Sequence, residues 1–401
     1  MNLHFLLKYG IVLILLPAIY IGFFPKKIVI IETACFGLFL ILLLYNRKYL
    51  RINEFDGKYC FYIFFLFSII TYIRAFFNID NSYDIISLAS GLMFQSFLFP
   101  LFLYLSSPYH LRYIWKSFLQ WGIPLCAICY FYPPSDGMRT FASNMAFINV
   151  FILCIPFVRI KYKIAIIIAV LITVSYNFDF RSILINNVIP FIIIIFWSFL
   201  RNRLIRKITI STLIIIPIVF LMLGITGKFN IFQFGNSMNF YLFEKTRGLT
   251  IDSRTSIYED VFHELDRKNA YIWGLGGNGK TQTSLSNNET KYGKLLAKYG
   301  RRGTESGMLN FIQYGGIIGF FVYGTLLITA AYKAGFESKN TFMEMLGVFI
   351  AFKFLYSFIE DEIMPNANTF YIFLWIGMCY NKVFRNLTDT EIKRYLNKIF
   401  A

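Results

Sequence analysis

The chain has 401 residues, of which 57% are hydrophobic and 15% charged, whereas soluble domains are about 45–50% apolar and about 25% charged. This composition excludes a soluble globular protein. The formal net charge of +17 would indicate nucleic acid as a partner of a soluble chain. In a membrane chain its meaning depends on where Lys and Arg lie relative to the apolar segments, and we expect no nucleic-acid partner.

Apolar segments of about 17 to 25 residues recur between short basic stretches, which is the length needed to cross about 30 Å of hydrocarbon. The sequence therefore predicts an all-α, polytopic membrane protein with about twelve transmembrane helices. The expected helices cover, in chain order, residues 6–24, 28–46, 59–77, 85–105, 113–132, 141–158, 163–178, 182–199, 208–226, 306–332, 342–359 and 368–384.

Basic residues beside the expected helices predict the orientation, because flanking Lys and Arg are retained on the cytoplasmic side. With the N-terminus inside and Lys8 set aside, the short cytoplasmic loops hold 20 Lys and Arg and the short outer loops hold four. We therefore expect both termini in the cytoplasm and a large external loop between the ninth and tenth helices. The chain divides into helices one to nine at 1–226, the external loop at 227–304, and helices ten to twelve with a cytoplasmic tail at 305–401.

The external loop is the one segment long enough to form a separate module. Within it, residues 253–265 place Ile257, Val261 and Leu265 at helical spacing, and Asp252 or Ser253 could cap the helix. We expect one amphipathic helix here, lying at the membrane surface.

Residues 274–281 fit the phosphate-binding pattern Gly-x-x-x-x-Gly-Lys-Ser/Thr. That pattern binds nucleotide where it joins a buried strand to a helix, and no such strand is expected around it. A turn is the favoured interpretation, or a glycine loop that lets the backbone approach a bound phosphate or sugar.

Arginines recur on the expected external face, at Arg139, Arg181, Arg254 and the pair Arg301 and Arg302. A single one could be a membrane-interface residue or part of a local ion pair. The guanidinium group matches phosphate oxygens, however, and the external loop carries twelve basic and seven acidic residues. Together they indicate an anionic ligand, for which a diphosphate is the simplest candidate.

Four sequence segments occur in a characteristic order: GMRTFASN at 137–144, FRS at 180–182, DSR at 252–254 followed by WGLG at 273–276, and TESGMLNFIQYGGIIG at 304–319. This order resembles that of the O-antigen polymerase (Wzy-type) and O-antigen ligase superfamily. The resemblance implies a C-type glycosyltransferase fold, metal-independent chemistry and no cofactor. It covers residues from about 137 to 319, and the helix count and loop position agree with it.

The resemblance and the external arginines together give the candidate site residues. Glu305, Arg254 and Arg181 are the catalytic candidates. The candidates for binding substrate are Arg139, Asn144, Arg301, Arg302, Gly274 and Gly276. Many members of the family have histidine where this chain has Glu305, which weakens the ligase interpretation and leaves the identity of the base open. Glu305 lies where the external loop enters the tenth helix, and it is the candidate base for the acceptor hydroxyl; the alternative is a charge that stabilises the start of that helix.

We expect a surface-polysaccharide polymerase of the bacterial inner membrane, with its active site facing the periplasm. It would transfer a growing glycan from undecaprenyl diphosphate to the terminal sugar of another lipid-linked repeat unit. The expected partners are this lipid-linked oligosaccharide and the bilayer, and a chain-length regulator is a further candidate. The alternatives are a ligase or other lipid-linked glycosyl transferase, and a flippase for lipid-linked oligosaccharide, although a flippase has no need of a large loop on one side.

Overall fold

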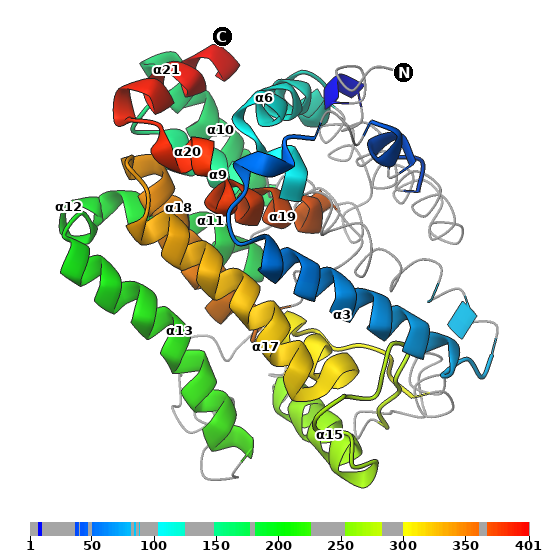
Figure 1. Cartoon of the computed structure of the whole chain (residues 1–401). Coiled ribbons are helices and arrows are strands. Elements are labelled where there is room, and N and C mark those ends of the chain that lie inside the picture. The colour runs from blue at the N-terminus through cyan, green and yellow to red at the C-terminus, as the bar shows by residue number, and fades with distance from the viewer. Residues whose placement is uncertain are drawn as a thin grey trace.

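The computed structural model describes residues 7–9, 37–39, 41–46, 50–81, 84–85, 88, 103–124, 148–176, 181–225, 253–282, 300–360 and 367–400. These residues form helices, turns and loops without a named strand (Figure 1). The α-helices are α3 (Lys58–Phe76), α6 (Pro108–Ser117), α9 (Ile148–Cys154), α10 (Ile160–Tyr176), α11 (Arg181–Ile195), α12 (Trp197–Leu200), α13 (Arg203–Ile225), α15 (Ser253–Arg267), α17 (Gly307–Phe336), α18 (Thr341–Tyr356), α19 (Ala367–Tyr380), α20 (Lys382–Asn386) and α21 (Asp389–Phe400). Three shorter turns are η2 (Ile52–Glu54), η5 (Leu103–Ser106) and η6 (Phe118–Gly122).

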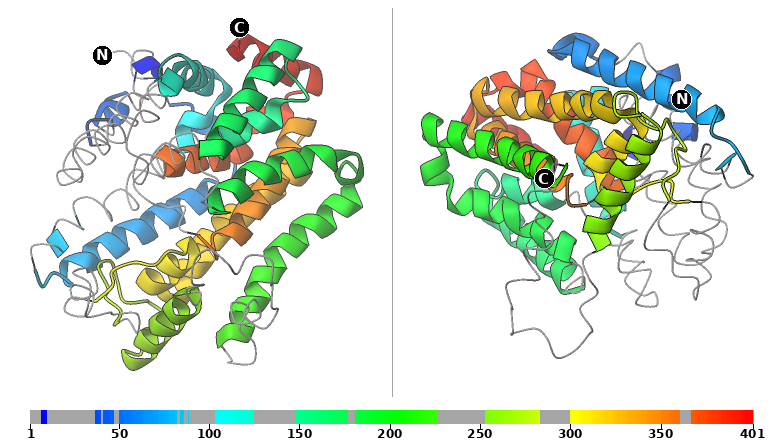
Figure 2. Two further views of the ribbon diagram at one scale, coloured as in Figure 1. Left: turned by 180° about the vertical axis from the view of Figure 1, so that it is seen from behind. Right: turned by 90° about the horizontal axis from the view of Figure 1, so that it is seen from below.

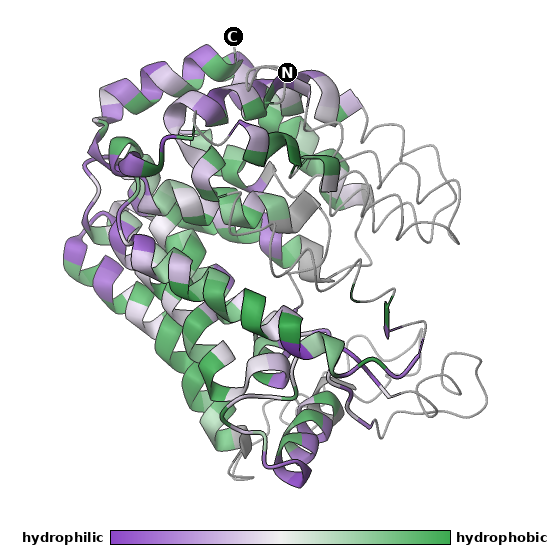
Figure 3. Ribbon diagram, turned by 45° about the vertical axis from the view of Figure 1, so that its right-hand side comes forward, coloured by the Kyte–Doolittle hydropathy of each residue, from purple (hydrophilic) through white to green (hydrophobic). Residues whose placement is uncertain are grey.

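Three described helices are long and apolar enough to cross a membrane, namely α3, α13 over Arg203–Leu223, and α17. Two shorter apolar helices cover Leu184–Ile195 and Phe370–Tyr380. Apolar residues form a broad band along the middle of the molecule, with polar residues concentrated at its two ends (Figure 3). The helical class expected from the sequence is therefore present, whereas the expected helices at 6–24, 28–46 and 85–105 lie largely outside the described residues.

The centre of the molecule is built from α17, which packs against α3, α18 and α19. Aromatic rings fill the contact: Phe64 of α3 lies 5.9 Å from Phe311 of α17 and 5.8 Å from Phe373 of α19, between ring centroids. Within α17, Phe311 stacks on Tyr323 with ring centroids 4.2 Å apart. Figure 2 shows α13 lying along the outside of α17 and α18. These buried rings contribute packing area and fix how the helices sit against each other.

The tenth expected helix, at 306–332, is present as α17 but is broken. Gly316 has φ 60° and ψ −146°, which lie outside the helical region, so the short segment before it and the long segment after it are separate helices. The chain bends sharply between them, because a Cβ atom built on Gly319 would lie 2.1 Å from the Phe311 carbonyl oxygen. Only glycine adopts this backbone conformation at low cost. The apolar pattern continues across the break, so it predicts one uninterrupted helix.

One end of the molecule, which we call the α21 end, gathers segments 50–58, 108–116, 157–163, 200–207, 333–344 and 381–398. These segments are far apart in sequence, and they carry most of the basic residues that the sequence analysis assigned to the cytoplasmic loops. Four contacts join them: Tyr395 Oη to the Pro108 carbonyl at 2.7 Å, Asn397 Nδ2 to the Phe157 carbonyl at 2.9 Å, Arg206 Nη2 to Glu344 at 2.8 Å, and Arg385 Nη1 to Glu337 at 2.6 Å.

The opposite end, which we call the α15 end, combines the last turn of α3, helix α15, residues 268–282 and 300–306, and residues 357–360. The helix expected at 253–265 is confirmed as α15, and Ile257, Val261 and Leu265 are buried as its pattern predicts. Six of the site residues predicted from the sequence lie at this end, namely Arg254, Gly274, Gly276, Arg301, Arg302 and Glu305.

Candidate functional site

The break in α17 is covered by the segment after α15. Main-chain groups that the broken helix leaves without a helical partner bond to this segment instead. The Leu275 amide donates to the Gln313 carbonyl at 2.7 Å, before the break, and the Ile317 amide donates to the Tyr271 carbonyl at 2.8 Å, after it. The segment therefore completes the hydrogen bonding of α17 and fixes the angle between its two parts.

Residues 274–281, the glycine loop, have a structural part in this arrangement. The Gly274 amide donates to the Ala270 carbonyl at 2.7 Å, and the Gly276 amide donates to the Tyr314 carbonyl at 3.0 Å. A phosphate-binding loop needs free amides at the start of a helix, whereas these two are used within the fold and no described helix follows them. Gly274 and Gly276 thus shape the site through their backbone, and their amides do not face a ligand.

The last turn of α3 holds the glycine loop from the other side. Arg74 Nη2 donates to the Gly274 carbonyl at 2.8 Å, and Asn78 Nδ2 donates to the carbonyls of Leu275 and Gly277 at 3.0 and 2.8 Å. A charged donor strengthens such a contact, since charge-assisted hydrogen bonds are about twice as strong as neutral ones. The loop is consequently clamped between α3 and α17.

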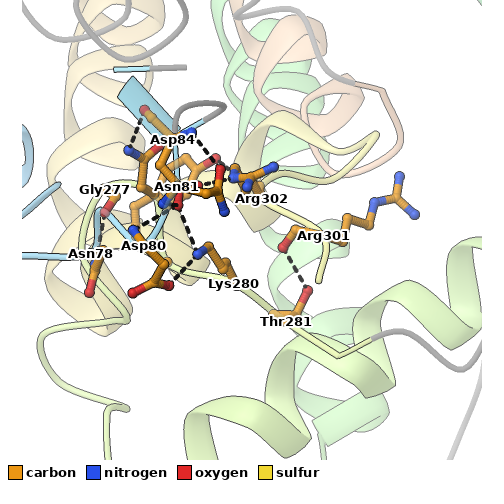
Figure 4. Close-up of polar contacts among 12 residues, drawn as sticks. Asn78, Asp80, Asn81, Asp84, Gly277, Lys280, Thr281, Arg301 and Arg302 are labelled. Atoms are coloured by element: carbon orange, nitrogen blue, oxygen red, sulfur yellow. Dashed lines mark hydrogen bonds and ion pairs between the residues drawn. The ribbon is translucent and has the colours of Figure 1, made fainter. Parts of the chain in front are cut away.

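A cluster of charged residues, the Asp84 cluster, consists of Asp84, Asp80, Lys280 and Arg302 (Figure 4). Asp84 is fully buried. Its Oδ2 accepts a hydrogen bond from Lys280 Nζ at 3.0 Å, and its Oδ1 accepts one from Arg302 Nε. Burial alone raises the pKa of Asp84, but the amide of Asp80 and the two cations outweigh it, so the pKa of this carboxyl lies below its usual value. The cluster ties the segment after α3 to the glycine loop and to the segment before α17.

The two adjacent arginines diverge. Arg302 points into the Asp84 cluster, whereas Arg301 points away from it (Figure 4). The cause is a two-residue antiparallel bridge in which Thr281 and Arg301 exchange main-chain hydrogen bonds of 2.9 and 2.8 Å, because successive side chains of an extended segment lie on opposite faces. Arg301 Nε donates to the Gly303 carbonyl at 2.7 Å.

Glu305 lies next to Arg301, with Nη2 of the arginine 3.4 Å from Oε1 of the glutamate. The Glu305 side chain is 57% exposed and the Arg301 side chain 17% exposed. The structure thus brings together two of the sequence candidates, a carboxylate and a guanidinium, just before α17 begins. An ion pair this exposed contributes only about 0–1 kcal/mol, so an incoming anion can replace the carboxylate on Arg301 at low cost.

Helix α15 is fastened beside this pair. Tyr258 Oη lies 3.2 Å from Ser306 Oγ and donates to the Phe358 carbonyl at 2.7 Å. Ser306 caps α17 by accepting from the Leu309 amide. One tyrosine therefore joins α15, the start of α17 and the end of α18 at the residue next to Glu305.

The remaining candidates are described only in part. Arg254 lies in the first turn of α15, four positions before Tyr258 and hence on the same helix face, and Arg181 is the first residue of α11; the side chains of both lie outside the description. Arg139 and Asn144 lie outside the described residues altogether.

One buried cation was not among the sequence candidates. Lys353 of α18 is 1% exposed, and its Nζ lies 2.6 Å from Asn186 Oδ1 of α11 and 5.3 Å from the ring centroids of Phe349 and Tyr356. Lysine in an apolar helix is costly unless it is solvated by such groups. Lys353 thereby holds α11, the helix that begins at Arg181, against α18.

The sequence signals for the remaining contacts were weak. Asp84 and Lys280 are single charged residues 196 positions apart, and nothing in their local pattern pairs them. Among the described residues no group of three or more His, Cys, Asp and Glu side chains could hold a metal ion. Neither a protein-family model, nor a curated protein, nor a solved structure matches the chain.

Proposed function

We propose that this chain is a membrane-embedded glycan polymerase that joins lipid-linked repeat units of a surface polysaccharide. In this proposal about twelve helices cross the bacterial inner membrane, the α21 end faces the cytoplasm and the α15 end faces the periplasm. The proposal follows the order of motifs in the sequence and the excess of basic residues at the α21 end.

The observation that carries the proposal is the pairing of Arg301 with Glu305 at the α15 end. Group transfer from a lipid diphosphate needs positive charge for the leaving group and an acceptor for the hydroxyl proton. Arg301 supplies the positive charge and Glu305 supplies the proton acceptor, and the two residues are only four positions apart. Arg302, bound to Asp84, is assigned the different task of holding this turn in place.

The reaction we assign to the pair is a single displacement. The acceptor hydroxyl oxygen forms a bond to the anomeric carbon of the donor glycan, and the bond from that carbon to the diphosphate oxygen breaks. The hydroxyl proton passes to the Glu305 carboxylate, and Arg301 stabilises the negative charge on the departing diphosphate. A preorganised cation of this kind supplies several kcal/mol of transition-state stabilisation.

Arg254 and Arg181 are proposed to complete the set of cations around the diphosphate. Arg254 shares a helix face with Tyr258, which reaches Ser306, and Arg181 begins the helix that Lys353 holds. Removing either guanidinium should raise the activation free energy by about 2 to 4 kcal/mol, which slows the reaction by tens- to several-hundred-fold. Lysine should restore only part of it because it lacks the planar pair of donors.

The test is reconstitution of the purified chain in proteoliposomes with undecaprenyl diphosphate-linked repeat units as the sole glycan. A ladder of products differing by one repeat unit supports polymerisation. A product that forms only when a lipid A core acceptor is added indicates a ligase. Movement of the intact lipid across the bilayer without bond formation indicates a flippase, and either result would overturn the proposal.

A further inference from the structure

We propose that the start of α10 binds an anionic phospholipid of the surrounding bilayer, with the headgroup on Arg159, Lys161 and Lys393 and an acyl chain along α10. This site lies at the α21 end, opposite the candidate glycan site. It requires α10 to face lipid and is independent of the polymerase activity.

Three basic residues lie near the start of α10. Arg159 and Lys161 are exposed where the helix begins, and the Arg159 amide donates to Asn397 Oδ1 of α21 at 3.0 Å. Asn397 Nδ2 in turn donates to the Lys393 carbonyl at 2.7 Å, one helical turn earlier on the same face of α21, and Lys393 is also exposed. The fold thus brings two distant basic segments to one place.

These positive charges are not neutralised by the protein. Within the described part of the chain, none of the three forms an ion pair. The nearest carboxylates on α21 are engaged by neutral groups: Asp389 accepts from the amide and hydroxyl of Thr341, and Glu391 accepts from the amide and hydroxyl of Thr388. The three cations therefore have their charge available for a phosphate group, and each nearby Lys or Arg adds about a five-fold factor to binding of an anionic lipid.

An apolar stripe continues from these charges along α10. Ile164, Ile168 and Leu171 follow Lys161 at three, seven and ten positions, which places them on one helix face, and they are 52, 51 and 61% exposed. The apolar residues of α21 cannot supply this surface, since Ile392, Leu396 and Ile399 are buried in the protein. A phospholipid has both a charged headgroup for the basic residues and an acyl chain for the exposed apolar stripe. Free phosphate has no apolar part that could contact the stripe.

The experiment measures lipid affinity of the purified full-length chain in neutral detergent by native mass spectrometry. Dioleoyl phosphatidylglycerol is titrated against dioleoyl phosphatidylcholine as the uncharged control. Wild-type protein should retain phosphatidylglycerol preferentially. The double variant Arg159→Gln and Lys161→Gln should bind it about 30-fold more weakly, as expected for the loss of two surface charges.

A matched control removes two charges from the same end. Lys339, just before α18, and Arg203, the first residue of α13, are also exposed at the α21 end but do not lie at the start of α10. Lys339→Gln with Arg203→Gln should therefore leave phosphatidylglycerol affinity within about two-fold of wild type. Equal losses in the two double variants would show that net charge alone attracts the lipid and would overturn the site. Full displacement of phosphatidylglycerol by glycerol 3-phosphate would do the same, because the stripe would then contribute nothing.

Discussion

Gly274 lies directly against Gly316, the residue at which α17 breaks. A Cβ atom built on Gly274 would lie 2.4 Å from the Gly316 amide nitrogen, and one built on Gly316 would lie 2.3 Å from the Tyr271 carbonyl oxygen. Both glycines have positive φ, 63° and 60°. The glycine loop therefore lies on the break in α17 through a backbone contact that leaves no room for a Cβ atom at either position.

Gly274→Ala should destabilise the protein by more than about 2 kcal/mol, because the substitution adds backbone strain at positive φ and a clash with backbone that cannot move aside. Thermal unfolding in detergent measures the effect as a lower Tm. Gly324→Ala in the same helix α17 is the control: its new Cβ would meet Phe354 at an ordinary 3.5 Å, so its Tm should stay close to that of wild type. Equal Tm values for the two variants would contradict the close contact.

Asp84→Asn should cost about 3 kcal/mol, because it leaves Lys280 and Arg302 largely buried without their shared carboxylate. Asp80→Asn is the control, since Asp80 contacts the same lysine but is 73% exposed. It should change the free energy of unfolding by less than about 1 kcal/mol. A small effect of Asp84→Asn would mean that the Asp84 cluster does not hold the loop.

The stability that Asp84 provides should depend on pH in a defined direction. Its pKa in the folded state lies below the ordinary value of 3.8, so its contribution is fully present above pH 3.8 and is lost as the pH falls through the folded pKa. The Tm difference between wild type and Asp84→Asn should therefore be constant between about pH 5 and 7 and shrink below pH 3.8. A difference that grows on acidification would contradict the assignment.

The proposed topology predicts opposite labelling of two positions. In a background without the six native cysteines, Ser286→Cys in the external loop should react with a membrane-impermeant maleimide from the periplasmic side. Lys398→Cys on α21 should react only after the cytoplasmic side is exposed. The reverse pattern would place the α15 end in the cytoplasm and remove the periplasmic site.

The sequence predicted those parts of the fold that depend on local pattern. The apolar runs predicted α3, α13 and α17, and the spacing of Ile257, Val261 and Leu265 predicted α15. It missed the break at Gly316, because hydropathy is the same on both sides of the break and the cause is a contact with a loop about 40 residues earlier in the chain.

The site was predictable only as a set of residue types. Sequence singled out Arg301, Arg302 and Glu305 together, but it could not divide the two arginines between different tasks. That division depends on the bridge between Thr281 and Arg301, and on Asp84, which has no local signal. Pairings between distant segments follow from tertiary packing, and a single sequence carries no periodic signal for them.

The rate at which purified Glu305→Gln protein extends lipid-linked repeat units tests the central claim most directly. Glu305 is 57% exposed and makes one ion pair, so the variant should unfold at nearly the wild-type Tm. If the carboxylate accepts the hydroxyl proton, the rate of extension should fall by about 10²-fold or more, while binding of the lipid-linked donor is retained. Extension at close to the wild-type rate would contradict the account and remove Glu305 from the reaction.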